Sequence, residues 1–195
     1  MRQSPAVQKQ YAYDPREEDV KPYETADPIG DDAHSPVKGI VHRYPDRVLF
    51  KVTDTCAVYC RFCFRKEMVG KGEGALRGEV LESAFNYIEL HKEVREIILS
   101  GGDPLTLSPR RLKDILQRLD ALDHLDNIRI HTRAPFVAPE RISDDLCNVF
   151  IGLNKPLYIV LHVNHADEIT GEVAKAFKAL HHSGAVLLSQ SVLLN

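Results

Sequence analysis

The sequence predicts an α/β fold, a partial barrel in which parallel strands alternate with helices and which is truncated after its fifth strand. From Arg47 onward, short β-branched or aliphatic runs alternate with stretches of helical period, which is the mark of β/α units and a parallel sheet. After a longer first unit the runs recur at roughly the spacing of a βαβ module, about 30 residues. A length of 195 residues favours one globular domain.

Five runs are expected to form the strands, because each is short and apolar, as buried parallel strands are. They span residues 48–53, 96–100, 127–132, 156–163 and 185–190. The final run, AVLLSQSVLLN, has no helix after it to cover the last strand. An uncovered apolar strand is an unfavourable end for a complete domain, so the sequence predicts truncation.

Helices are expected between the strands. The clearest has Ser108 as N-cap and Pro109 at its first position. Its apolar stripe consists of Leu112, Ile115, Leu116 and Leu119. Weaker stripes of the same period predict helices over residues 81–88, 142–150 and 169–180.

Residues 1–46 differ in character from the rest of the chain. They are polar and contain six prolines among turn-forming Asp and Gly residues, a pattern that predicts an extended arm and not a packed helix. The expected organisation is therefore an N-terminal arm over 1–46 and a partial barrel over 47–195.

Composition limits the class of partner. The chain has 25 Lys and Arg against 28 Asp and Glu, and a protein that binds nucleic acid non-specifically needs an excess of cations. No run approaches the roughly 20 apolar residues of a membrane-spanning helix, and the N-terminus lacks the core of a signal peptide. We therefore expect a cytoplasmic protein with no nucleic-acid or membrane partner, in which clustered cysteines bind metal rather than form disulfides.

Cys56, Cys60 and Cys63 form a C-x3-C-x2-C motif directly after the first expected strand. Loops at the carboxyl ends of parallel strands are where α/β folds bind ligands. Soft thiolates suit zinc or the iron of an iron–sulfur cluster, and a four-iron cluster held by three cysteines keeps one iron open for a chelating ligand. A Cys3His zinc site and a trio of buried thiols are the alternatives. Cys147 is expected to be a core residue of its helix.

This cysteine spacing, with Phe62 before the last cysteine, resembles the cluster loop of radical S-adenosylmethionine (SAM) enzymes. In that superfamily a [4Fe–4S] cluster binds SAM through its open iron and cleaves it reductively to a 5′-deoxyadenosyl radical. The resemblance implies that Gly101 and Gly102 of SGGDPL lie against the methionyl ammonium, where the lack of a Cβ permits close approach. By itself the Gly-Gly pair is also typical of an ordinary strand-to-helix turn.

Further SAM contacts follow from the same resemblance. His162 and Gln190, at the ends of the fourth and fifth expected strands, resemble polar contacts to SAM. Asp103 either orients the ammonium of SAM, which we favour, or caps the next helix. Whether His131 and Arg133 line the same cavity is left open.

Six segments resemble a narrower family, the lysine 2,3-aminomutases. They are GIVHRYPDRVLF, CAVYCRFCFRKEMVG, LSGGDPL, HTRAPFVAPERI, LHVNHADEIT and QSVLLN. The resemblance runs from about Thr25 to the end of the chain. It implies an isomerase that combines SAM and a [4Fe–4S] cluster with pyridoxal 5′-phosphate (PLP) to convert L-lysine into β-lysine by a 1,2-amino shift.

The aminomutase resemblance assigns Arg43, Tyr44 and Arg47 to the PLP phosphate, a role that suits guanidinium and phenol groups. It assigns Arg65 to the carboxylate of the substrate amino acid. Without the resemblance, the first three would be interpreted as a solvated basic turn and Arg65 as a surface charge. The region that would supply the PLP-binding lysine is absent, so the catalytic residues stay unassigned.

The partners implied are a small amino acid, in the first instance lysine, and an electron donor such as flavodoxin or ferredoxin. A homo-oligomer is compatible with the sequence. Two alternatives stand beside the free-lysine enzyme: a relative that isomerises lysine for attachment to elongation factor P, and a non-catalytic iron–sulfur or zinc-binding fragment of such an enzyme.

Overall fold

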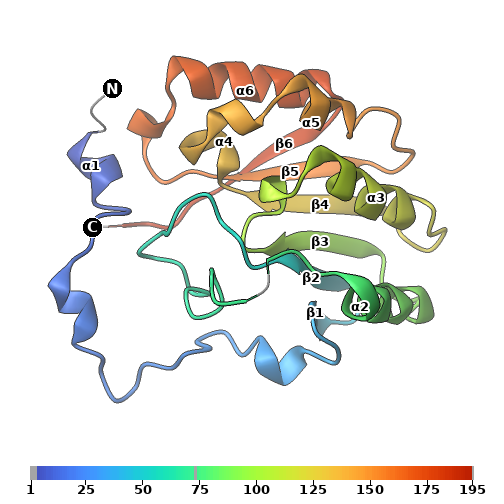
Figure 1. Cartoon of the computed structure of the whole chain (residues 1–195), viewed down its shortest axis with the longest axis horizontal. Helices are drawn as coiled ribbons and strands as arrows, with labels where there is room; N and C mark the ends of the chain where they lie inside the picture. Colours follow the sequence, from blue (N-terminus) through green and yellow to red (C-terminus); the bar gives the residue numbers. More distant parts are fainter. Residues whose placement is uncertain (1–3, 73, 195) are drawn as a thin grey trace.

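The computed structural model describes residues 4–72 and 74–194 as a single sheet with helices packed against it. The strands follow one another across the sheet in chain order (Figure 1). They are β1 (Ile40–Tyr44), β2 (Arg47–Thr53), β3 (Glu96–Gly101), β4 (Asn127–Thr132), β5 (Leu157–His162) and β6 (Val186–Gln190). β1 pairs with β2 in the antiparallel sense, and every later pair is parallel. The predicted partial β/α barrel is confirmed as an open, mostly parallel sheet.

Apart from α1, which precedes β1, the helices connect successive parallel strands. The longer ones are α2 (Gly78–Leu90), α3 (Pro109–Asp120) and α6 (Gly171–His182), and the short ones are α1 (Pro5–Gln8), α4 (Ala134–Val137) and α5 (Asp144–Asn148). Single 3₁₀ turns lie at η1 (Pro15–Glu18), η2 (Asp32–His34), η3 (Pro104–Thr106), η4 (Pro139–Arg141) and η5 (Ala166–Glu168). Since the strand order is sequential and such crossovers are right-handed, these connections cover one face of the sheet.

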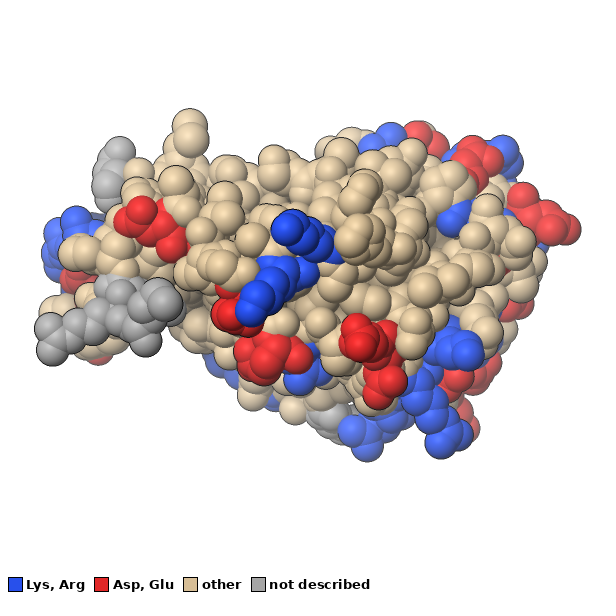
Figure 2. Space-filling view, turned by 90° about the horizontal axis from the view of Figure 1, so that it is seen from above, with Lys and Arg blue, Asp and Glu red and all other residues tan. Residues whose placement is uncertain are grey.

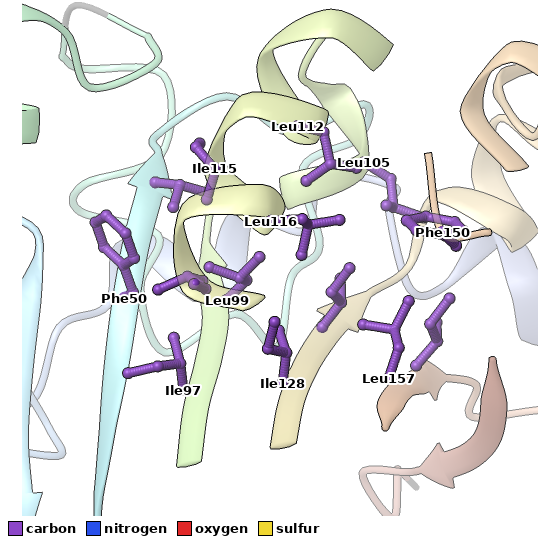
Figure 3. Close-up of a cluster of buried hydrophobic side chains, with 14 of the residues drawn as sticks. Phe50, Ile97, Leu99, Leu105, Leu112, Ile115, Leu116, Ile128, Phe150 and Leu157 are labelled. Atoms are coloured by element: carbon purple, nitrogen blue, oxygen red, sulfur yellow. The ribbon is translucent and has the colours of Figure 1, made fainter. Parts of the chain in front are cut away.

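The core lies between this face and the helices. Alternate residues of β2, β3 and β4 point into it, and the rings of Phe50 and Phe85 meet edge to face with centroids 5.5 Å apart. Leu112 and Leu116 of α3 sit over Ile128 and its neighbours (Figure 3). All five side chains are fully buried, so the predicted apolar stripe of this helix is its core face.

Serine and threonine caps fix where the helices begin. Ser108 accepts a hydrogen bond from the backbone N–H of Arg111 at the start of α3, as the sequence predicts. The helix predicted over 142–150 is shorter, because Ser143 caps α5 and the chain leaves the helical path after residue 148. The helix predicted over 169–180 begins two residues later, at Gly171, with Thr170 as its cap.

The N-terminal arm is more structured than predicted. It contains α1 and two 3₁₀ turns, and its last part, β1, joins the sheet at the edge. The end of the predicted arm is therefore part of the sheet. The short IVHRY run of β1 ends at a Pro45-Asp46 turn, and those turn residues close a hairpin with β2. The division at residue 46 stays a prediction, although β1 lies on the arm side of it.

The opposite face of the sheet, here called the inner face, carries the other alternate residues of each strand. On β4 these are Asn127, Arg129 and His131, all partly exposed. Charged side chains of both signs are scattered over the surface seen in Figure 2, with no large patch of one sign. None of the helices within the described ranges is both long and apolar enough to cross a bilayer.

Candidate cofactor site

The cysteine motif lies on the loop that follows β2, at the edge of the sheet where the parallel strands end (Figure 1). A turn joins two of its members, since the backbone N–H of Cys63 donates to the carbonyl of Cys60 at 3.0 Å. Cys56, Cys60 and Cys63 are all half-buried, whereas Cys147 is buried on the helical side, as expected of a core residue.

The chemistry of the three thiols fits a metal cluster. Burial raises the pKa of Cys56 to about 12 and the pKa of Cys60 to about 11, so these groups become thiolates only when a cation compensates for burial. Among the described residues, no three His, Cys, Asp or Glu side chains converge as the ligands of one metal ion. A four-iron cluster does not require that convergence, because each cysteine binds a different iron.

Gly101 and Gly102 hold the base of the cysteine loop. The N–H of Gly102 donates to the carbonyl of Thr53 at 2.6 Å, and the N–H of Asp103 donates to the carbonyl of Thr55 at 2.8 Å. A Cβ on either glycine would overlap those carbonyl groups, and Gly101 also has a φ of +112°. The Gly-Gly turn therefore fastens the end of β3 to the segment that carries Cys56.

Asp103 caps a turn, which is the second of the two roles considered from sequence. Its Oδ1 accepts from the N–H of Leu105 and from the Thr132 hydroxyl, at 3.0 and 2.7 Å. Its Oδ2 accepts from the N–H groups of Arg133 and Ala134, at 2.8 and 2.9 Å. With four donors on a carboxylate that is buried, the geometry does not support the favoured contact with a cofactor ammonium.

A buried ion pair lies next to the cysteine loop. The guanidinium of Arg133 donates to Glu168 at 2.7 Å, and the two side chains are 7% and 2% exposed. The ring of Phe62 lies over that guanidinium at 5.1 Å and near the ring of His162, with centroids 5.3 Å apart. Since Phe62 lies between Cys60 and Cys63 in the sequence, the Arg133–Glu168 pair contacts the cysteine loop through the Phe62 ring.

The N-terminal arm completes this network. Gln10 accepts from Arg133 at 2.5 Å and donates to Glu168 at 3.2 Å, and the Tyr11 hydroxyl accepts from Arg133 at 2.6 Å. The carbonyl of Gln10 in turn accepts from the backbone N–H of Arg61 in the cysteine loop. Sequence reasoning missed Gln10, Tyr11 and Glu168, because nothing in their local sequence indicates that residues over 120 positions apart in the chain meet here.

The predicted SAM contacts at the last two strands lie side by side. His162 ends β5 and is paired in register with Gln190 at the end of β6. The pKa of His131 is lowered to about 4, mainly by burial and to a smaller extent by the charges of Arg129 and Arg65. Gln190 is close enough to His131 to oppose that shift. His131 therefore faces the same space as His162 and Gln190, which was left open from sequence.

Arg65 is already engaged by a carboxylate of the arm. Its Nε donates to Asp31 at 2.8 Å, with side chains 15% and 10% exposed, and its guanidinium carbon lies 4.6 Å from the centre of the Phe64 ring. The interpretation as a free surface charge is thus not supported. Arg65 binds a carboxylate of the protein itself, and its contact with a substrate carboxylate stays a prediction.

The predicted phosphate motif lies at the other end of β2 from the cysteine loop. Arg43 and Tyr44 are exposed at the β1–β2 hairpin, and Arg43 donates to the carbonyl of Ile29. Arg47 pairs with Asp46 at 3.0 Å and its guanidinium lies 5.8 Å from the centre of the Tyr44 ring. The structure brings Tyr44 and Arg47 into contact and places Arg43 at the same hairpin with its side chain on Ile29, all of them a strand's length away from the cysteines.

The sequence is similar to those of known proteins. The model of the radical SAM superfamily matches residues 50–186. An L-lysine 2,3-aminomutase of Methanococcus maripaludis is 43% identical over 96% of this chain and 43% of its own length, and one of Fusobacterium nucleatum is 42% identical over 86% of this chain and 39% of its own. A glutamate 2,3-aminomutase of Clostridioides difficile is 38% identical over 88% of this chain and 40% of its own length.

The chain thus spans about two fifths of the length of these curated relatives. Its superfamily match begins inside β2 and ends at the start of β6. It therefore includes the cysteine loop, the Gly-Gly turn that anchors it and His162 at the end of β5, whereas Gln190 lies just beyond it. The chain belongs to the radical SAM superfamily.

Proposed function

We propose that this chain provides the radical-generating part of an amino-acid aminomutase of the lysine 2,3-aminomutase type. The proposal depends on the position of the cysteine loop at the carboxyl end of β2. The Gly-Gly turn binds its backbone there, and Arg133 packs against Phe62 of the loop. Its three thiols share one loop, and burial raises the pKa of Cys56 and of Cys60, so these two remain protonated unless a cation joins them. That donor set fits a [4Fe–4S] cluster with one open iron.

The proposal gives a task to each candidate site residue. Cys56, Cys60 and Cys63 would hold the cluster, which with SAM would supply a 5′-deoxyadenosyl radical, the electron coming from a donor such as flavodoxin or ferredoxin. His162 and Gln190, adjacent at the ends of β5 and β6, bind polar groups of SAM. Gly101 and Gly102, whose lack of a Cβ lets the turn pack against the carbonyls of Thr53 and Thr55, would lie near the methionyl ammonium of SAM.

The substrate proposed is an α-amino acid, in the first instance lysine, processed together with PLP. Arg65 lies two positions after the last cysteine, and its partly buried guanidinium already holds a carboxylate, that of Asp31. PLP would stabilise the radical during the 1,2-shift, with its phosphate on Arg43, Tyr44 and Arg47. Because a glutamate 2,3-aminomutase is among the relatives, the carboxylate contact suits amino acids with different side chains.

The direct test is anaerobic reconstitution of the purified chain with iron and sulfide. We expect charge-transfer absorbance from the cluster and, after reduction with SAM present, release of 5′-deoxyadenosine. Cys60→Ala should lose both, whereas Cys147→Ser, a change at the buried cysteine behind the sheet, should keep both. Zinc in place of iron, or a cluster that releases no nucleoside, would contradict the proposal. Formation of β-lysine on addition of PLP and lysine tests the amino-acid step separately.

A further inference from the structure

Unsatisfied polar atoms gather on the inner face of the sheet. Within residues 4–72 and 74–194, four buried side-chain nitrogen or oxygen atoms have no hydrogen-bond partner. Three belong to alternate residues of β4, namely Asn127 Oδ1, Arg129 Nε and His131 Nε2, and the fourth is Nε2 of His162 at the end of β5. Such atoms are rare in folded proteins and costly unless a ligand pairs with them.

Arg129 lies at the same end of the inner face as the predicted phosphate motif. Glu96, the first residue of β3, accepts from Arg129 at 2.6 Å and lies 3.6 Å from the guanidinium of Arg47. The Glu96 side chain is only 10% exposed, whereas those of Arg129 and Arg47 are 29% and 41% exposed. One nearly buried carboxylate therefore holds two guanidiniums side by side, with solvent access left to the cations.

The charge at this end of the face favours an anion. Arg47 and Arg129 bring two cations, and Arg43 brings a third at the adjacent hairpin, where it donates to the carbonyl of Ile29. Asp46 and Glu96 bring two carboxylates, both engaged with Arg47. Arginine forks match the geometry of phosphate oxygens, and such charge-assisted hydrogen bonds are among the stronger ones in proteins.

We propose that Arg129 is a further ligand of the phosphate group at this site, held in place by Glu96. This inference rests on the proposed function, in which Arg43, Tyr44 and Arg47 bind the phosphate of PLP. It adds a residue from β4 to a motif drawn from the β1–β2 hairpin. The phosphate is then held between the hairpin and the middle of the sheet, and not at the exposed hairpin alone.

The position of Arg129 also orients the ligand. β2 runs from Arg47 to Thr53, six steps of roughly 3.3 Å, so the phosphate end and the cysteine loop are separated by about 20 Å. His131, two residues beyond Arg129 on the same strand, faces the space between them. A phosphate fixed at Arg129 leaves the remainder of the cofactor pointing along the inner face toward Cys56.

The test is a binding titration with pyridoxamine 5′-phosphate, whose amine, unlike an aldehyde, does not react with surface lysines. Unphosphorylated pyridoxamine isolates the contribution of the phosphate, and the fluorescence of either compound reports binding without any turnover. We expect Arg129→Gln to weaken binding of the phosphorylated compound about tenfold or more and to leave pyridoxamine unaffected. Arg129→Lys, which keeps the charge but not the fork, should fall between.

Two controls keep the outcomes distinct. Arg95→Gln removes one cation near the same end of the sheet, where Arg95 is exposed and paired with Asp126, and it should leave binding unchanged. Arg43→Gln reports on the predicted motif. If the wild-type chain binds both compounds equally, the PLP part of the proposed function falls, and Arg129 with it. If Arg43→Gln loses the preference for phosphate while Arg129→Gln keeps it, or Arg95→Gln weakens binding equally, only the role of Arg129 is overturned.

Discussion

Removing one member of the Arg133–Glu168 pair should destabilise the whole chain. In Arg133→Met the buried carboxylate of Glu168 keeps its N–H donors from Asn164 and His165, at 2.8 and 2.9 Å, but loses its cationic partner, the Arg133 guanidinium at 2.7 Å. Breaking a buried pair in this way costs about 3–5 kcal/mol of unfolding free energy. For a chain of this length that corresponds to a fall in Tm of roughly 6–20 °C.

The assay is urea unfolding of four proteins: wild type, Arg133→Met, Glu168→Gln and the double variant. Because the second substitution removes a charge that the first has already left unpaired, the double variant should cost less than the sum of the single variants, by at least about 1 kcal/mol. Arg95→Gln, in an exposed pair whose side chains are 52% and 56% exposed, should cost no more than about 1 kcal/mol.

Additive single effects, or a loss below 1 kcal/mol for Arg133→Met, would refute the interpretation of this pair as a buried, coupled unit. The network also predicts a local effect. Gln10 and Tyr11 bind the same guanidinium, so the N-terminal segment should become more susceptible to proteolysis in Arg133→Met than in the Arg95→Gln control. Equal cleavage rates would show that the arm is held by other contacts.

Three further outcomes are expected. Gly102→Ala places a Cβ against the carbonyl of Thr55 and should cost about 1–3 kcal/mol in urea unfolding; an unchanged midpoint would contradict the close approach. Because the pKa of His131 is lowered to about 4, the unfolded chain takes up a proton first as the pH falls from about 6.5 toward 4, so stability drops in that window. His131→Gln should flatten this dependence, and an identical slope would refute the assignment. Asp31→Asn breaks a largely buried pair with Arg65 and should lower the free energy of unfolding by about 1–3 kcal/mol. An unchanged Tm in calorimetry would contradict this prediction.

Apolar patterning was sufficient to predict the parallel sheet. The run NIRIHT became β4 with the predicted bounds, because a strand buried on its helical face needs β-branched residues at alternate positions. β1 was missed since its five residues end in His, Arg and Tyr, and its pairing depends on a hairpin with the following strand. Local composition does not report such pairing.

The candidate site was predictable where motif spacing carries the chemistry. The cysteines and the Gly-Gly turn lie at one edge of the sheet, because the carboxyl ends of parallel strands always meet there. Arg129 could have been found, since Asn, Arg and His alternate along its strand and so must share one face. Asp103 shows the limit, because only the folded chain reveals that four donors surround its carboxylate.

The contact between the first residues and the cysteine loop has a practical consequence for purification. Val7 is buried, and the carbonyl of Lys9 accepts a hydrogen bond from the Arg61 guanidinium at 2.9 Å, so a polyhistidine tag fused at the amino terminus would be joined to a segment that contacts the cysteine loop. Imidazole groups there would compete for iron and retain nickel or zinc leached from the affinity column. A tag after Leu194 would also be joined close to this loop, because Leu194 lines the same groove as Arg61. Material for metal analysis should therefore be freed of its tag by a protease before iron is added.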